Sequence, residues 1–138
     1  MKLELTSLEK AVAALERSIN AAAAFEDSLP AELKDTVRSG IIQNFEVAYE
    51  LSWKMMKRWL ENNISAEAVD GVTRRELFRR AAENNLIVDV DDWLSFHSSR
   101  NETAHTYDQE MAEEVSLAAK EFVYEAQSLL TALRERND

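Results

Sequence analysis

The chain has 138 residues, with 16 basic and 26 acidic side chains, so its formal net charge is −10. It contains no cysteine, which excludes disulfide scaffolds, zinc–thiolate sites and cysteine nucleophiles. Two glycines and one proline are too few for a turn-rich β protein, and the net acidity argues against indiscriminate binding to nucleic acid or membrane.

The length predicts a single domain over residues 1–138, since domains usually run to about 100–200 residues. No apolar run reaches the roughly 18–20 residues of a membrane span. The first residues include an acid at Glu4 and no apolar signal segment, so we expect a cytoplasmic protein that does not contact the membrane.

The first half of the chain predicts two long amphipathic helices. Apolar residues recur at helical spacing from Leu8 to about residue 27, after a capping-box pattern at Thr6 and Glu9. Pro30 separates this helix from a second one, expected over about residues 31–62. The inner face of the second helix is formed by Val37, Ile41, Phe45, Ala48, Ser52, Met55 and Trp59.

The second half predicts two short helices and a final long one. Thr73 and Glu76 form another capping-box pattern, which opens a helix to about residue 84. Residues 87–90 fit either a short strand or the entry to a short helix that includes Trp93. Amphipathic spacing returns over about residues 108–134. The expected fold class is therefore all-α, an antiparallel up-down bundle of four main helices plus a short extra helix.

Polar residues suited to chemistry gather over residues 98–108, where the apolar periodicity lapses. On an unbroken helix Arg100 and His105 would point about 140° apart, so they share a site only if the helix breaks between them. Thr106 and Gln109 form a third capping-box pattern, which would begin the last helix just after His105. A guanidinium, an imidazole and a helix N-terminus together suit a phosphate or a phosphodiester, and the alternative is plain capping and surface roles.

The sequence predicts no metal site. Its two histidines, His97 and His105, have no second histidine or cysteine at the spacing of metal ligands. The acidic side chains are spread over helix faces that we expect to be exposed.

Two segments carry a resemblance to a known family. Arg100, Asn101, His105 and Tyr107 match the Arg-polar-x3-His-x-Tyr signature of the HepT-like branch of the HEPN superfamily, which includes nucleotidyltransferase substrate-binding proteins. Residues 42–54 are similar to the Gln-x-Phe-Glu-x3-Glu-x2-Trp-Lys run of that branch. Arg75, Glu76 and Arg80 resemble its short third helix, and the likeness spans about residues 5–135.

The resemblance implies a homodimeric ribonuclease toxin in which the two signatures meet across the interface. Its implied antitoxin is a minimal nucleotidyltransferase, which uses ATP to adenylylate the signature tyrosine, Tyr107 here. Arg100, His105 and Asn101 are the implied catalytic residues, acting on RNA without a cofactor or metal of their own. The chemistry agrees, because an imidazole transfers protons near neutral pH and an arginine stabilises developing phosphate charge.

Two other functions stay open at this point. The chain fits a non-catalytic substrate-binding subunit of a nucleotidyltransferase complex, or a structural helical dimer with a decayed site. The resemblance places Gln43, Glu46 and Glu50 at the cleft or the dimer seam, whereas spacing alone also fits a solvated stripe in which Lys54 pairs with Glu50.

The aromatic and basic residues outside the signature also have two interpretations. We expect core positions rather than base-stacking platforms for Tyr49, Trp53, Trp59 and Trp93. The densest basic cluster fits either a salt-bridged helix or a patch for the RNA backbone, and consists of Arg74, Arg75, Arg79 and Arg80.

Overall fold

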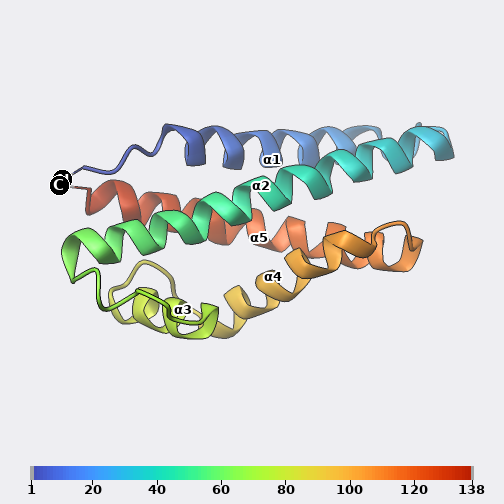
Figure 1. The fold of residues 1–138 in the computed structure, drawn as a ribbon. Helices are drawn as coiled ribbons and strands as arrows, with labels where there is room; N and C mark the ends of the chain where they lie inside the picture. The colour runs from blue at the N-terminus through green and yellow to red at the C-terminus, as the bar shows by residue number, and fades with distance from the viewer. Residues whose placement is uncertain (1, 138) are drawn as a thin grey trace.

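The computed structural model describes residues 2–137, which fold into a bundle of helices joined by short turns (Figure 1). The helices are α1 (Thr6–Phe25), α2 (Ala31–Asn63), α3 (Arg74–Glu83), α4 (Val90–Glu102), the 3-10 turn η1 (Thr103–His105) and α5 (Gln109–Glu135). α1, α2 and α5 run alongside one another, and α3 and α4 cover the other side of α2 and α5. α2 contacts every other α-helix, and the two chain ends lie together at one end of the bundle.

The expected all-α fold is confirmed, and within residues 2–137 no segment forms a strand. The strand interpretation of residues 87–90 is wrong, because Asp89 begins α4 instead. Its carboxylate accepts hydrogen bonds from the backbone N–H groups of Asp91 at 2.8 Å and Asp92 at 3.2 Å. A carboxylate in this position satisfies donors that the first helical turn leaves free, and it interacts well with the positive end of the helix dipole.

The capping-box patterns have mixed outcomes. Thr73 caps α3 as expected, because its hydroxyl accepts from the Glu76 N–H at 3.2 Å. The box at Thr6 is wrong. Thr6 is already the first residue of α1, and its N–H donates to the carboxylate of Glu4 at 3.0 Å. The acid that serves this helix end therefore precedes the helix instead of lying three residues into it.

The core is centred on aromatic rings from three helices. Phe122 of α5 is fully buried, and its ring centre lies 5.2 Å from that of Phe45 on α2 and 5.2 Å from that of Phe96 on α4. Trp93 joins the same cluster at 5.5 Å from Phe122. Of the aromatic residues expected in the core, Trp53 is the exception, because it is only half-buried.

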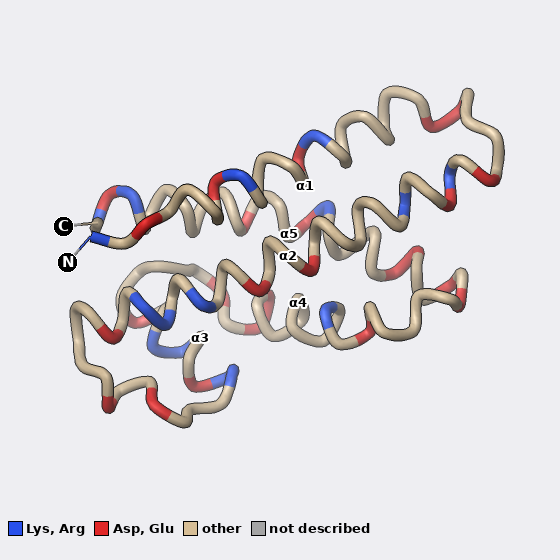
Figure 2. Tube along the Cα trace, turned by 45° about the horizontal axis from the view of Figure 1, so that its top comes forward, with Lys and Arg blue, Asp and Glu red and all other residues tan. Residues whose placement is uncertain are grey.

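Acidic and basic residues are distributed differently over the bundle (Figure 2). Acidic positions are spread along the helices, whereas several basic positions gather where the end of α2 approaches α3. Among the described residues, no helix combines the length and the apolar composition that crossing a membrane requires.

Candidate functional site

A break in the helix separates Arg100 from His105, as the sequence predicts. α4 ends at Glu102, one 3-10 turn covers Thr103 to His105, and α5 begins only at Gln109. Because the helix is broken, the fixed offset of about 140° on a straight helix does not apply to these two side chains.

The predicted cap of α5 by Thr106 is wrong. The capping residue is Asp108, whose carboxylate accepts from the Glu110 N–H at 3.0 Å. The Thr106 hydroxyl donates to the backbone carbonyl of Thr103 at 3.2 Å instead. His105 therefore lies on the 3-10 turn, several residues before the first turn of α5.

The guanidinium of Arg100 is held from two sides. Its Nε donates to Glu50 Oε1 at 3.1 Å, and its Nη1 donates to the Thr103 hydroxyl at 3.0 Å. Glu46 contributes a longer ion pair, 3.9 Å from Nη1. Within residues 2–137 no group is hydrogen-bonded to Nη2. The arginine is thus fixed in orientation, with one nitrogen left for another acceptor.

Glu50 connects this arginine to an aromatic side chain. Its second carboxylate oxygen accepts from Trp53 Nε1 at 3.0 Å. The solvated-stripe interpretation with a Lys54–Glu50 pair is therefore wrong for Glu50. Lys54 stands 5.7 Å from the centre of the Trp53 ring instead. Thr103 and Trp53 are site neighbours that the sequence reasoning missed, although the three-residue spacing from Glu50 to Trp53 is a usable signal on a helix.

The other signature side chains are exposed. Tyr107 is 88% exposed, and its ring centre lies 6.2 Å from that of His105, nearly perpendicular to it. Asn101 and Gln43 are exposed, and neither side chain makes a hydrogen bond to a described residue. The structure thus brings Arg100 together with two acids and His105 together with Tyr107, while Asn101 and Gln43 stand apart.

A second histidine lies one helical turn before Arg100. The Nδ1 atom of His97 is 2.7 Å from the hydroxyl of Tyr49. Burial raises the pKa of Tyr49 and lowers the pKa of His97, and the positive charge of Arg74 lowers the His97 pKa further. Both groups are therefore neutral at pH 7, and the imidazole tautomer sets which of the two donates in this hydrogen bond. No sequence pattern joins two residues 48 positions apart.

The basic cluster of α3 divides into two parts. Arg79 and Arg80 both pair with Glu76, at 3.3 and 3.4 Å, as the salt-bridged interpretation predicts. Arg74 does not join them, because its guanidinium stacks 3.3 Å above the centre of the Trp53 ring. Its Nε is buried and has no hydrogen-bond partner among residues 2–137. A polar chain thus runs from Thr103 through Arg100, Glu50 and Trp53 to Arg74.

No three histidine, aspartate or glutamate side chains come together as a metal-binding group in the described part of the chain.

Comparison with known proteins identifies the family. The profile described as "Nucleotidyltransferase substrate binding protein like" matches residues 3–135, nearly the whole chain. The chain belongs to this family of nucleotidyltransferase substrate-binding-like proteins. The match confirms the resemblance that the signature and the α2 run carry.

This chain is similar to known proteins over nearly the whole length of each. A Haemophilus influenzae protein named "Probable ribonuclease HepT" is 37% identical over 99% of this chain and 95% of its own length. A solved Haemophilus influenzae structure, described as the substrate-binding domain of a nucleotidyltransferase, is 36% identical with a TM-score of 0.89, and covers 95% of this chain and 99% of the other. A Thermus thermophilus structure is 26% identical with a TM-score of 0.73, over 92% and 98% of the two chains.

Proposed function

We propose that this member of the family is a HepT-like ribonuclease toxin, paired with a minimal nucleotidyltransferase as its antitoxin. It acts as a homodimer and cleaves RNA without a metal at the cleft where two signatures meet. The antitoxin silences it by using ATP to attach AMP to Tyr107. The chain itself needs no cofactor.

The observation that supports this most is the way Arg100 is held. Glu50 and Thr103 fix the guanidinium at the end of α4, directly before the turn that exposes His105. An arginine that is already oriented when the substrate binds can stabilise the negative charge of the phosphorane, because its side chain need not rearrange during the reaction. The Nη2 of Arg100 is hydrogen-bonded to no described residue, so it is available to a phosphate oxygen.

The reaction requires two proton transfers at one phosphate. A base removes the proton of the 2′-hydroxyl as this oxygen attacks the phosphorus, and an acid gives a proton to the 5′-oxygen as its bond to phosphorus breaks. One signature supplies one imidazole, His105. The second imidazole comes from the other copy, which is why the proposal requires a dimer. Asn101 is then placed to contact the phosphate or the second copy.

Exposed apolar surface supports the dimer. Val47 on α2 is 47% exposed, between Glu46 and the Arg100-bound Glu50. Gln43 lies one turn before Val47 on the same face. A second copy that covers this face would bring two signatures together, as an enclosed cleft for RNA requires.

The alternative is a non-catalytic substrate-binding subunit of a nucleotidyltransferase complex. The surroundings of Arg100 favour this alternative in one respect. Glu46 and Glu50 together carry more negative charge than the guanidinium carries positive charge, so the three side chains have a net negative charge. Such a subunit would form a stable complex with its nucleotidyltransferase and would neither cleave RNA nor stop growth when expressed alone.

The deciding experiment is RNA cleavage by purified, unmodified protein. We expect cleavage of tRNA or mRNA in the presence of EDTA, abolished in Arg100→Ala and His105→Ala and kept in the surface control Arg58→Gln. Induced expression of the same set should stop growth only for the wild type and the control. No cleavage by the wild type, or cleavage that His105→Ala leaves unchanged, would exclude the ribonuclease and leave the binding subunit.

A further inference from the structure

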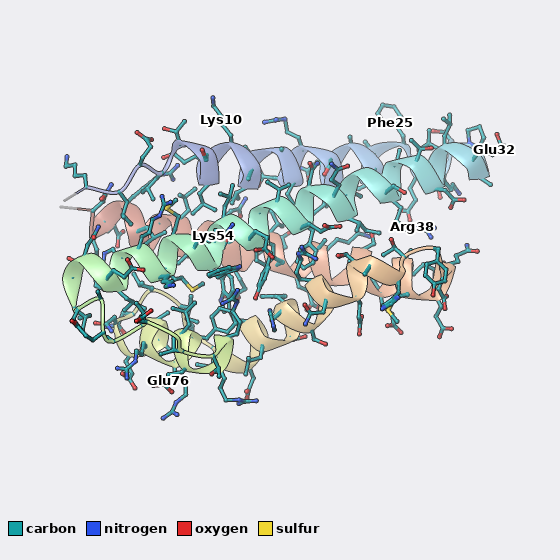
Figure 3. The ribbon with its side chains drawn as sticks, viewed as in Figure 1. Lys10, Phe25, Glu32, Arg38, Lys54 and Glu76 are labelled. Atoms are coloured by element: carbon teal, nitrogen blue, oxygen red, sulfur yellow. The ribbon has the colours of Figure 1, made fainter. Side chains whose placement is uncertain are left out.

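A hollow of about 270 Å³ lies beside Tyr107, between the first turns of α2 and the turn that leads into α5. Tyr107 and Thr106 line it from the turn, and Arg38 and Ser39 line it from α2. Figure 3 shows Arg38 between α2 and the turn that leads into α5. This volume leaves room for a phosphate group and part of a sugar.

Arg38 gives the hollow its positive charge. Its side chain is 21% exposed, and its ion-pair partner is Asp35, at 3.7 Å, which is 71% exposed and also lines the hollow. A long and exposed pair of this kind contributes little to stability. A phosphate offers paired oxygens that match the planar guanidinium, so it would displace Asp35 at low cost.

Tyr107 is exposed at the edge of the same hollow. Its ring is 88% exposed at the rim of the hollow, so the active site of a second protein can reach the phenol oxygen. Ser39 lines the same space, and a serine hydroxyl can donate to a phosphate oxygen, whereas the proton of the Thr106 hydroxyl is already donated to the Thr103 carbonyl. The acid that begins α5, Asp108, is bound to the N–H of its own helix and does not line the hollow.

We propose that this hollow seats the phosphate of the nucleotide attached to Tyr107, with Arg38 as its counter-ion. The inference rests on the proposed adenylylation and adds the place where the product lies. In the transfer, the Tyr107 oxygen forms a bond to the α-phosphorus of ATP and the bond from that phosphorus to the bridging oxygen breaks. Pyrophosphate leaves with the electron pair, and the phenol proton passes to a solvent base. The diester formed keeps one negative charge, which Arg38 neutralises.

The test measures how well the attached nucleotide is protected. Wild type, Arg38→Gln, Asp35→Asn and the control Arg58→Gln are modified to completion with the partner nucleotidyltransferase and ATP. Each is then treated with a phosphodiesterase, and loss of AMP is followed by intact mass. We expect Arg38→Gln to lose AMP about tenfold faster than wild type, as expected when one charged hydrogen-bonding partner is removed. Asp35→Asn should lose AMP more slowly, because the competing carboxylate is gone, and Arg58→Gln should match wild type.

The outcomes separate the two proposals. If wild type accepts no nucleotide at Tyr107, the adenylylation and the seat both fail. If wild type is modified but Arg38→Gln and wild type lose AMP at equal rates, the seat fails and adenylylation stands. Equal rates combined with weaker RNA cleavage by unmodified Arg38→Gln would assign the hollow to the RNA path. Failure of a folded Arg38→Gln variant to accept AMP, while Arg58→Gln accepts it, supports a phosphate contact already present during transfer.

Discussion

Arg100 shows how single residues of this site depend on neighbours that are distant in sequence. Its guanidinium is oriented by Glu50, which is 50 positions away, and by Thr103, which is three positions away. Glu50 in turn is held by Trp53. These contacts remove rotational freedom from the Arg100 guanidinium, so its orientation is set before a substrate binds.

The first prediction concerns this orientation. Glu50→Gln keeps the size of the side chain but loses the ion pair with Arg100, and we expect kcat for RNA cleavage to fall about tenfold or more with a small change in KM. Glu46→Gln is the matched control, since its contact with Arg100 is longer. Single-turnover cleavage of both variants checks this. Equal losses in the two, or a faster Glu50→Gln enzyme, would mean that Glu50 only screens the charge.

The Tyr49–His97 pair gives a prediction about pH. The His97 pKa is lowered in the fold, first by burial and then by the positive charge of Arg74, while Glu50 acts in the opposite direction. The unfolded chain therefore binds a proton more readily, so this group costs stability as pH falls below about 6.5, its ordinary pKa.

Urea unfolding at pH 7.5 and pH 5.5 measures that effect. We expect wild type to lose more free energy of unfolding between the two pH values than His97→Gln, which cannot be protonated at this position. Carboxylates titrate in both proteins, so the difference between them isolates His97. A His97→Gln variant with the same pH dependence as wild type would show that burial does not disfavour the charged imidazole.

At the scale of helices, the end of α4 and the beginning of α5 place the signature. α4 stops after Arg100, η1 presents His105, and Asp108 starts α5 with its carboxylate on the Glu110 N–H. Because Tyr107 directly precedes this cap, the position of the phenol depends on where α5 begins. Caps of this kind satisfy N–H groups that no helical carbonyl reaches.

Removing the cap tests that dependence. Asp108→Ala should lower the free energy of unfolding by about 1 kcal/mol, the usual value for loss of an N-cap, whereas Asp108→Asn should retain most of it. Urea unfolding gives the stability, and amide exchange of residues 106–112 shows whether the start of α5 frays. Equal stability of the alanine variant and wild type would mean that Asp108 does not begin α5.

At the scale of the whole molecule, Phe122 links the layer of long helices to α4. It is fully buried against Phe45, Tyr49, Trp93 and Phe96. Tyr49 carries the hydroxyl that bonds His97, so the packing of this ring connects the core with the polar contacts between α2 and α4. The net charge of −10 bears on the proposed function, because an acidic surface would confine the proposed RNA binding to a local site and make it sensitive to salt.

Truncating this ring should be costly. Phe122→Ala is expected to lower the free energy of unfolding by about 3–5 kcal/mol, through lost burial and the cavity left behind. Leu117→Ala is the control on the same helix, since that side chain is 61% exposed, and it should change stability by less than about 0.5 kcal/mol. Thermal and urea unfolding of both variants decide this, and a small loss for Phe122→Ala would contradict its central position.

The sequence by itself determined the helices, their inner faces and the family, because these depend on local spacing and on short motifs. The stripe from Ile41 to Trp59 is buried as its period predicts, and the break after Arg100 lies where the apolar pattern lapses. Only the tertiary structure decided which side chains meet. Packing of α4 on α2 joins Arg100 to Glu50 and His97 to Tyr49, and packing of the turn before α5 on α2 forms the hollow between Tyr107 and Arg38. Such pairs depend on how helices cross, and no spacing along one helix contains that information.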